Sequence, residues 1–224
     1  MHRLTSLVLL GILLLATAAW SQTPSALESA PTGWKDIMPP ASLAGWTRLP
    51  FMSNTPMNPE SQWKVDAATT TLLCEGNKGH EWLRFDQELT DFIFHAEFRF
   101  TKIEGGRGYN SGIFGRNNAD GTVYVQAQAG EGGSGWLFGS TPGAAGAPGQ
   151  RFNLRADMKE DRVKPAGEWN VFELKADGPD VSVWVNGAVT SEKKDLSVLK
   201  GYIGLEAEGY RIEFRNLKLK ELKK

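Results

Sequence analysis

The sequence has 224 residues, and its 25 Lys and Arg residues nearly balance 26 Asp and Glu residues, for a formal net charge of −1. This balance, without a basic stripe, argues against a nucleic-acid partner. Cys74 is the single cysteine, which excludes a disulfide within the chain. Its strand-like surroundings favour a small buried hydrophobe over a nucleophile.

The N-terminal segment, residues 1–21, has the composition of a signal peptide. Arg3 precedes an apolar run, and small residues follow up to Ser21. The run is shorter than the roughly 18–20 residues of a spanning helix, so a retained membrane anchor is the less favoured alternative. We expect export to the periplasm or the extracellular space, with no membrane attachment after cleavage. Residues 22–32, rich in Pro, Ser and Ala, are predicted to be a linker to a single domain at 33–222.

Alternating apolar residues predict that this domain is all-β. In the segment 91–103 every second residue from Phe92 to Phe100 is apolar, which places one face in a core. Segments 168–177 and 180–190 are predicted strands, and Asn186-Gly187 predicts a tight hairpin turn. Segments 200–209 and 210–222 are predicted to form a closing hairpin around Gly209, and the glycine-rich segment 130–150 a long loop. The expected fold is two packed antiparallel sheets, a jelly-roll sandwich.

Polar residues occupy the strand positions that alternate with the core positions. Such a set offers the donors, acceptors and aromatic rings that hydroxyl-rich ligands require, so we interpret it as a carbohydrate site, with an ordinary solvated sheet face as the alternative. Its members are His95, Glu97, Arg99, Asn110, Arg116, Tyr124, Gln126, Gln128, Glu206 and Glu208.

Glu206 and Glu208 share one face of a predicted strand, with Cβ atoms about 6–7 Å apart. Three roles fit this spacing: a carboxylate pair for glycoside cleavage, ligands for a divalent cation, or ion-pair partners of Arg211 or Arg116. His95 is a candidate base, whereas His80 is expected to be solvent-exposed. No metalloprotease, serine-hydrolase or phosphate-binding motif is present.

Several motifs in order resemble the 3-keto-disaccharide hydrolase domain family. They include "GYNSGIFGR", "VYVQAQAG", "GEWN", "VNG" and "GYIGLEAEGYRIEFRN", and the resemblance covers residues 33–222. It implies a concanavalin A-like or LamG-like jelly roll, exported from bacteria, that acts on glycosides oxidised to a ketone at C3. A sugar 3-dehydrogenase in the same pathway is then an expected partner, and an unidentified divalent cation a possible cofactor.

With this resemblance in view, we assign hypothetical roles to residues of the polar face. The predicted catalytic residues are Glu206 or Glu208 as base or cation ligand, Arg116 as oxyanion partner, and Tyr124. The predicted substrate-binding residues are Asn110, Gln126, Gln128, His95, Glu97 and Trp136.

The chain departs from the family pattern at two positions, and at a third, Glu208, it resembles one branch of the family whereas other members have a histidine. Tyr124 stands where relatives typically have an acidic residue, and Ala129 where many have a histidine. A non-catalytic carbohydrate-binding module, with Trp82 and Trp136 stacking on sugar rings, is therefore the alternative function. A cell-surface adhesion domain is a third.

Overall fold

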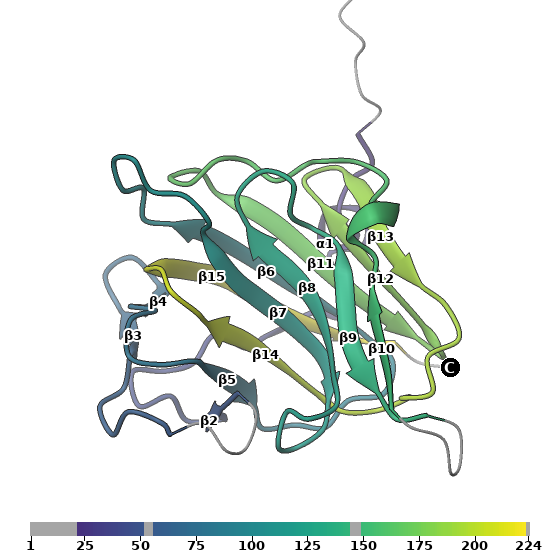
Figure 1. Ribbon diagram of the computed structural model, residues 1–224, viewed down its shortest axis with the longest axis horizontal. Coiled ribbons are helices and arrows are strands. Elements are labelled where there is room, and N and C mark those ends of the chain that lie inside the picture. The colour runs from purple at the N-terminus through teal and green to yellow at the C-terminus, as the bar shows by residue number, and fades with distance from the viewer. Residues whose placement is uncertain (1–21, 52–55, 144–148, 223–224) are drawn as a thin grey trace, which may run out of the picture.

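The computed structural model describes residues 22–51, 56–143 and 149–222 (Figure 1). Two antiparallel sheets lie one over the other. Sheet A comprises β1 (Lys35–Asp36), β3 (Trp63–Asp66), β4 (Thr71–Cys74), β6 (Phe92–Phe100), β11 (Asn170–Asp177), β12 (Asp180–Val185), β13 (Ala188–Lys193) and β15 (Ile212–Glu221). Sheet B comprises β2 (Trp46–Pro50), β5 (Glu81–Phe85), β7 (Asn110–Asn117), β8 (Tyr124–Gly130), β9 (Leu137–Thr141), β10 (Gln150–Asn153) and β14 (Tyr202–Ala207). The predicted all-β, two-sheet sandwich is confirmed.

The strand order explains how distant segments form one site. Sheet A runs β13-β12-β11-β6-β15-β4-β3, with β1 beside β15, and sheet B runs β10-β9-β8-β7-β14-β5-β2. Strand β14 therefore lies between β5 and β7, although more than 80 residues separate β7 from β14. Side chains from four segments of the sequence can meet on one face of sheet B.

The core lies between the sheets and is rich in aromatic residues. Phe92, Phe94, Phe98 and Phe100 of β6 are buried, as the alternating pattern predicts. From sheet B, the alternate residues Val125, Ala127 and Ala129 of β8 and Ile203, Leu205 and Ala207 of β14 face them. Each fully buried Phe or Leu side chain contributes about 1.5–3 kcal/mol to folding, so the core needs no disulfide.

Two predicted connections differ from those observed. Strands β14 and β15 belong to different sheets, so the predicted hairpin around Gly209 is wrong and the turn there crosses from sheet B to sheet A. The segment 130–150 is not one long loop, because Leu137–Thr141 forms β9, which pairs with β8. Alternation identifies a strand and its two faces, but not the sheet that it joins.

The segment 22–32, for which a linker was expected, lies against the outer face of sheet A. It contains α1 (Ala26–Ser29), which Ser25 and Glu28 cap reciprocally. The Glu173 carboxylate on β11 accepts hydrogen bonds from the backbone of Ala26 and Leu27, at 2.6 and 3.0 Å. The expected signal peptide, residues 1–21, lies outside the described residues. No helix in the described part of the chain is long and apolar enough to cross a membrane.

Candidate functional site

Strand register gathers polar side chains on the outer face of sheet B. On β14, Gly204 lies opposite Phe114 of β7, so continuing the antiparallel register brings Glu206 beside Gly112 and Glu208 beside Asn110. On the far side of β7, Gly112 lies opposite Gln128 of β8. Directly opposite residues of an antiparallel pair project from the same face, so the carboxylates and amides share this surface.

The centre of this surface is a cluster formed by His80, Glu206 and Glu208, which we call the carboxylate–imidazole cluster. His80 Nε2 lies 2.7 Å from Glu206 Oε1 and 3.9 Å from Glu208 Oε2. One potential ligand atom from each residue lies within 4.8 Å of the others. The Glu206 side chain is only 2% exposed, whereas those of His80 and Glu208 are 33% and 39% exposed. The buried carboxylate therefore fixes the imidazole, and the other two groups can reach a ligand.

Amide side chains from β7 and β8 hold the carboxylates in place. Gln126 Nε2 donates to Glu206 Oε2 at 2.6 Å, and Asn110 Nδ2 donates to Glu208 Oε2 at 2.6 Å. Gln128 Nε2 in turn donates to Asn110 Oδ1 at 2.6 Å. Hydrogen bonds to charged groups are the stronger kind, so this network restricts the orientation of both carboxylates.

Glycine at position 112 allows the Gln126 side chain to cross β7. A Cβ atom on Gly112 would lie 2.1 Å from Gln126 Nε2 and 2.5 Å from Gln126 Cδ. The amide therefore occupies the space above Gly112, between Gln126 on β8 and Glu206 on β14. Any larger residue at 112 would displace the amide from Glu206.

The cluster shifts the proton affinities of its members. Burial opposes the charged imidazole, but the hydrogen bond to Glu206 and the charges of Glu206 and Glu208 outweigh it, so the pKa of His80 is raised. Burial, with the neighbouring charge of Glu208, raises the pKa of Glu206, and its hydrogen bond to His80 acts in the opposite direction. Both shifts favour retention of a proton between Glu206 and His80.

His80 is not among the site residues predicted from the sequence, and the expectation that it is merely solvent-exposed is wrong. It directly precedes β5, whose residue Glu81 lies opposite Ala207 of β14. Phe51 stacks on the imidazole at 4.6 Å between ring centroids, and its backbone N–H donates to the His80 carbonyl. Only the pairing of β5 with β14, which no local pattern shows, indicates that His80 meets Glu206.

The ion-pair alternative for Glu206 and Glu208 is also wrong. Arg211 lies 3.8 Å from Glu75, and Arg116 lies 3.2 Å from Asp91. The nearest cationic partner of the two carboxylates among the described residues is His80.

Arg116 does not belong to the polar face, which corrects its prediction as an oxyanion partner. Its side chain is fully buried and its guanidinium donates to the carbonyls of Gly178, Val198 and Thr90 and to Asp91 Oδ1. These partners are turn and loop groups at the end of the sandwich. Its φ of 55° accompanies a register shift between β7 and β14, which turns the side chain away from the cluster.

His95 and Glu97 lie on the outer face of the opposite sheet, so their predicted place in the same site is wrong. His95 Nδ1 lies 2.9 Å from Glu173 Oε1 within sheet A. Glu97 accepts hydrogen bonds from Arg215 and Asn216 of β15. Both residues alternate with core positions as predicted, but β6 belongs to sheet A whereas β14 belongs to sheet B.

The remaining predicted residues lie on or beside the outer face of sheet B. Tyr124 packs against Phe51 and Phe114, and burial, opposed by Arg151, raises the pKa of its phenol. Trp136 lies at the start of β9, where Gln128 N donates to its carbonyl. Trp82, proposed as a stacking ring, is fully buried under this face and cannot contact a ligand.

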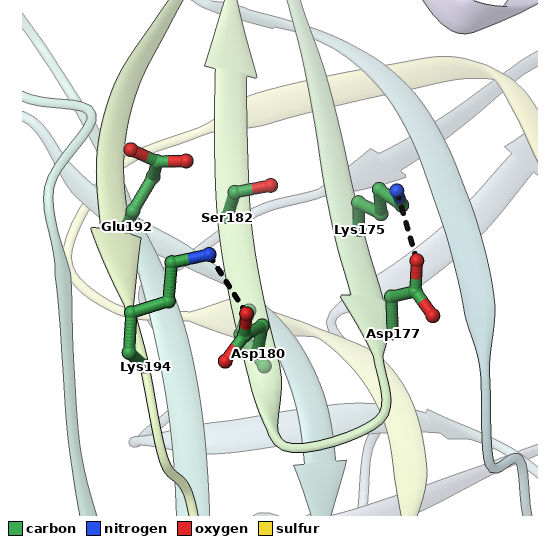
Figure 2. A pocket seen from close by; sticks show the side chains of 7 residues that line it. Lys175, Asp177, Asp180, Ser182, Glu192 and Lys194 are labelled. Atoms are coloured by element: carbon green, nitrogen blue, oxygen red, sulfur yellow. Dashed lines mark hydrogen bonds and ion pairs between the residues drawn. The ribbon is translucent and has the colours of Figure 1, made fainter.

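A depression of about 300 Å³ adjoins the cluster. Asn110 and Gln128 form the wall nearest to Glu208, and Trp136, Arg155 and Glu131 complete the polar and aromatic lining. A separate hollow of about 410 Å³ lies over β11, β12 and β13 of sheet A. Two ion pairs lie in this hollow, Lys175 with Asp177 and Lys194 with Asp180 (Figure 2). We therefore place the candidate site on sheet B.

The cluster also has the composition of a cation site. An imidazole nitrogen and two carboxylate oxygens suit first-row transition ions, and the open side toward solvent leaves room for further ligands. His80, Glu206 and Glu208 would hold such an ion, with Asn110 and Gln126 orienting the carboxylates from behind.

Three solved structures share this architecture. A candidate glycosyl hydrolase from Parabacteroides distasonis is 14% identical, with a TM-score of 0.60, and the match covers 90% of this chain and 99% of that chain. The carbohydrate-binding module CBM66 from Bacillus subtilis is 14% identical, with a TM-score of 0.53 and coverage of 78% and 94%. LamAcat from Zobellia galactanivorans is 11% identical, with a TM-score of 0.54 and coverage of 79% and 90%. At these identities the likeness establishes the jelly-roll fold and nothing about the reaction.

No curated protein matches the sequence. The family model described as "3-keto-alpha-glucoside-1,2-lyase-like domain" matches residues 33–220, most of the chain and nearly all of the two sheets. The family predicted from the sequence motifs is thereby confirmed: the chain belongs to the 3-keto-alpha-glucoside-1,2-lyase-like domain family.

Proposed function

We propose that this protein cleaves the glycosidic bond of 3-keto-glycosides, with the carboxylate–imidazole cluster as its catalytic centre. One observation carries the proposal: a buried carboxylate, Glu206, holds an imidazole 2.7 Å away, beside a second carboxylate that reaches solvent. This arrangement supplies a base and a proton donor side by side on an open sheet face. Membership of the family supports the choice of this substrate class.

A ketone at C3 makes the proton on C2 acidic, which allows elimination across C1 and C2. A base removes the C2 proton, and the electron pair of that bond forms the enolate of the C3 ketone. The enolate then re-forms the ketone as the C1–O bond breaks, leaving a C1=C2 double bond and an alkoxide that takes a proton. Addition of water, with hydroxide at C1 and a proton at C2, completes a net hydrolysis.

The geometry divides these tasks among the residues. Glu208 is partly exposed and is oriented by Asn110, so we assign it as the base for the C2 proton. His80, whose pKa is raised, is the proton donor to the departing oxygen. Glu206 is a positioning residue, because it is buried and acts through His80. Gln126 secures Glu206 and does not need to touch the substrate.

A divalent cation held by His80, Glu206 and Glu208 would be an alternative to this division of tasks, because an imidazole nitrogen that binds a metal ion has no proton to donate. Bound to His80, Glu206 and Glu208, it would stabilise the negative charge that develops on the C3 oxygen. The carboxylates would still be oriented by Asn110 and Gln126.

The proposed substrate implies a preceding oxidation step, and we also propose a compartment from the N-terminal composition. A 3-keto-glycoside arises by oxidation of a sugar hydroxyl, so a sugar 3-dehydrogenase must supply it. The composition of residues 1–21 supports export, and action in the periplasm or outside the cell follows from it. Purified protein from culture medium or periplasm that begins near Gln22 would support this; a chain retaining residues 1–21 in the cytoplasm would refute it.

The central experiment is turnover of a 3-keto-glucoside with a chromogenic leaving group. We expect release of the chromophore, at least a hundredfold slower release with Glu208→Gln or His80→Gln, and no change with Lys175→Gln from sheet A as the matched control. In D₂O, deuterium should appear at C2 of the product. Addition of a chelator, and then of Mn²⁺ or Zn²⁺, tests the cation.

The carbohydrate-binding alternative makes a different prediction for the same samples. Binding of the keto sugar without turnover, unchanged by Glu208→Gln, would refute the enzymatic proposal. That result would mean that the chain binds sugar without catalysis. Tyr124 and Ala129, which stand where relatives carry an acid and a histidine, would then account for the loss of activity.

A further inference from the structure

The depression beside Asn110 lies next to the carboxylate–imidazole cluster and has a polar and aromatic lining. It is bounded on one side by the loop before β7 and on the other by the β8–β9 hairpin. Two backbone contacts fix these walls: Gly108 N donates to Glu131 Oε1 and Gly133 N donates to Asp161 Oδ2, both at 2.8 Å. The depression is therefore a built feature of sheet B, with a volume near the lower end of the roughly 300–1,000 Å³ range of small-molecule sites.

Asn110 connects the depression to the catalytic cluster. Its Nδ2 donates to Glu208 and its Oδ1 accepts from Gln128, which lines the depression. Neighbouring strands lie about 4.8 Å apart, so the lining residues Asn110 on β7 and Gln128 on β8 are one to two strand spacings, about 5–10 Å, from Glu208, which directly follows β14. That offset suits two consecutive rings of one disaccharide.

The lining suits a neutral pyranose. The Arg155 guanidinium lies 4.9 Å from the centroid of the Trp136 ring and has no carboxylate partner among the described residues. It can therefore donate to ligand hydroxyls while it stays stacked on the indole. Glu131 also lines the depression, where its Oε1 accepts from Gly108 N, and its negative charge balances the charge of Arg155. Opposite charges, amides and one aromatic ring favour hydroxyl groups over a net-charged ligand.

We propose that this depression is the subsite for the sugar expelled from C1, and that Trp136 and Arg155 make the enzyme select a neutral pyranose leaving group over a small alcohol. This inference rests on the proposed function, since it names the leaving group of the same reaction. It assigns Arg155, which no sequence motif singles out, as a residue that determines specificity.

The test compares two 3-keto-glucosides, a methyl glycoside and a disaccharide whose leaving group is glucose. Wild type should show a higher kcat/KM for the disaccharide, and Arg155→Ala or Trp136→Ala should each lower the ratio of the two constants about tenfold, as expected for loss of one polar or ring contact. Lys175→Gln should leave the ratio unchanged. An unaltered ratio in both variants would overturn the inference.

A binding measurement separates this inference from the proposed function. Glucose alone should shift the NMR signal of the Trp136 indole N–H, identified by its absence in Trp136→Phe, and Arg155→Ala should weaken the binding about tenfold. If neither keto-glycoside is cleaved but glucose shifts the signal, the proposed function fails and the sugar subsite stands. If the keto-glycosides are cleaved but glucose gives no shift, the subsite is refuted and the reaction stands.

Discussion

Replacing Gly112 with alanine should disturb the carboxylate–imidazole cluster, although Gly112 itself has no side chain that could react or bind. The new Cβ would lie 2.1 Å from Gln126 Nε2, far inside van der Waals contact, so the amide must leave its place. Gly112 does not have a positive φ, so the backbone itself accepts alanine. The substitution thus acts mainly on the 2.6 Å hydrogen bond between Gln126 and the buried Glu206.

The expected cost follows from that bond. A hydrogen bond to a charged group is worth about 1.5–3 kcal/mol, and crowding of a packed face adds about 1 kcal/mol or more. We therefore expect Gly112→Ala to lower the free energy of unfolding by about 2–4 kcal/mol, measured by urea denaturation with tryptophan fluorescence. Turnover should fall as well, because Glu206 then holds His80 less firmly.

A double-mutant cycle tests the reasoning. Once Gln126→Ala has removed the amide, adding Gly112→Ala should cost less than about 1 kcal/mol, because the two changes act on the same contact. Gly132→Ala, whose Cβ would find only Asp161 Oδ2 at 3.7 Å, is the matched control and should be nearly neutral in stability. If Gly112→Ala costs as much without Gln126 as with it, the glycine serves the backbone of β7 and not the amide.

Three further predictions address the pH dependence and the misassigned residues. His80 has a raised pKa and acts as a protonated donor, so kcat/KM should decline as the pH rises above about 6.5 through that pKa, and His80→Gln should remove this decline. The pKa of Glu97 is lowered to about 2, chiefly by His95 and further by the hydrogen bonds from Asn216 and Arg215. The ionised Glu97 therefore stabilises the fold fully above about pH 4.5, and the free energy of unfolding should fall by about 3 kcal/mol as the pH drops toward 2. Urea titrations should show this loss in wild type and a flatter pH profile in Glu97→Gln. Arg116→Met should lower the free energy of unfolding by about 3–5 kcal/mol, because Asp91 loses its cationic partner, although it keeps the Gly178 N–H, and three carbonyls lose the guanidinium as donor.

Each of these has an outcome that would contradict it. An alkaline decline that persists in His80→Gln would assign the titration to another group. An acid-stability profile shared by wild type and Glu97→Gln would remove Glu97 as its cause. A loss below about 1 kcal/mol in Arg116→Met, with turnover abolished, would return Arg116 to the catalytic residues.

Alternation in the sequence was sufficient to predict the sandwich and much of the polar face. It separates Phe94 from His95 on β6, and Leu205 from Glu206 on β14, because side chains alternate strictly along a strand. It also groups Gln126 with Gln128, and both lie beside the cluster as that grouping implies.

What alternation cannot supply is the assignment of strands to sheets. His95 and Glu206 occupy equivalent non-core positions, yet they lie on opposite outer faces of the sandwich because β6 and β14 belong to different sheets. Arg116 has the parity of Asn110, but a register shift in β7 redirects it into the buried end of the sandwich. His80 precedes its strand and meets Glu206 only through a pairing of segments more than 100 residues apart.

The N-terminal segment, residues 22–29, is attached to one face of the domain. Thr23 hydrogen-bonds to the Gly187 carbonyl, and α1 is anchored by Glu173, so the chain from Gln22 onward is fastened to the outer face of sheet A. The carboxylate–imidazole cluster lies on the outer face of sheet B, at the other side of the sandwich. The described chain therefore enters the domain on the face opposite the cluster, and its first residues leave the cluster uncovered. A fragment that starts at residue 33, where the family match begins, would lack this fastening and leave Glu173 without two of its donors.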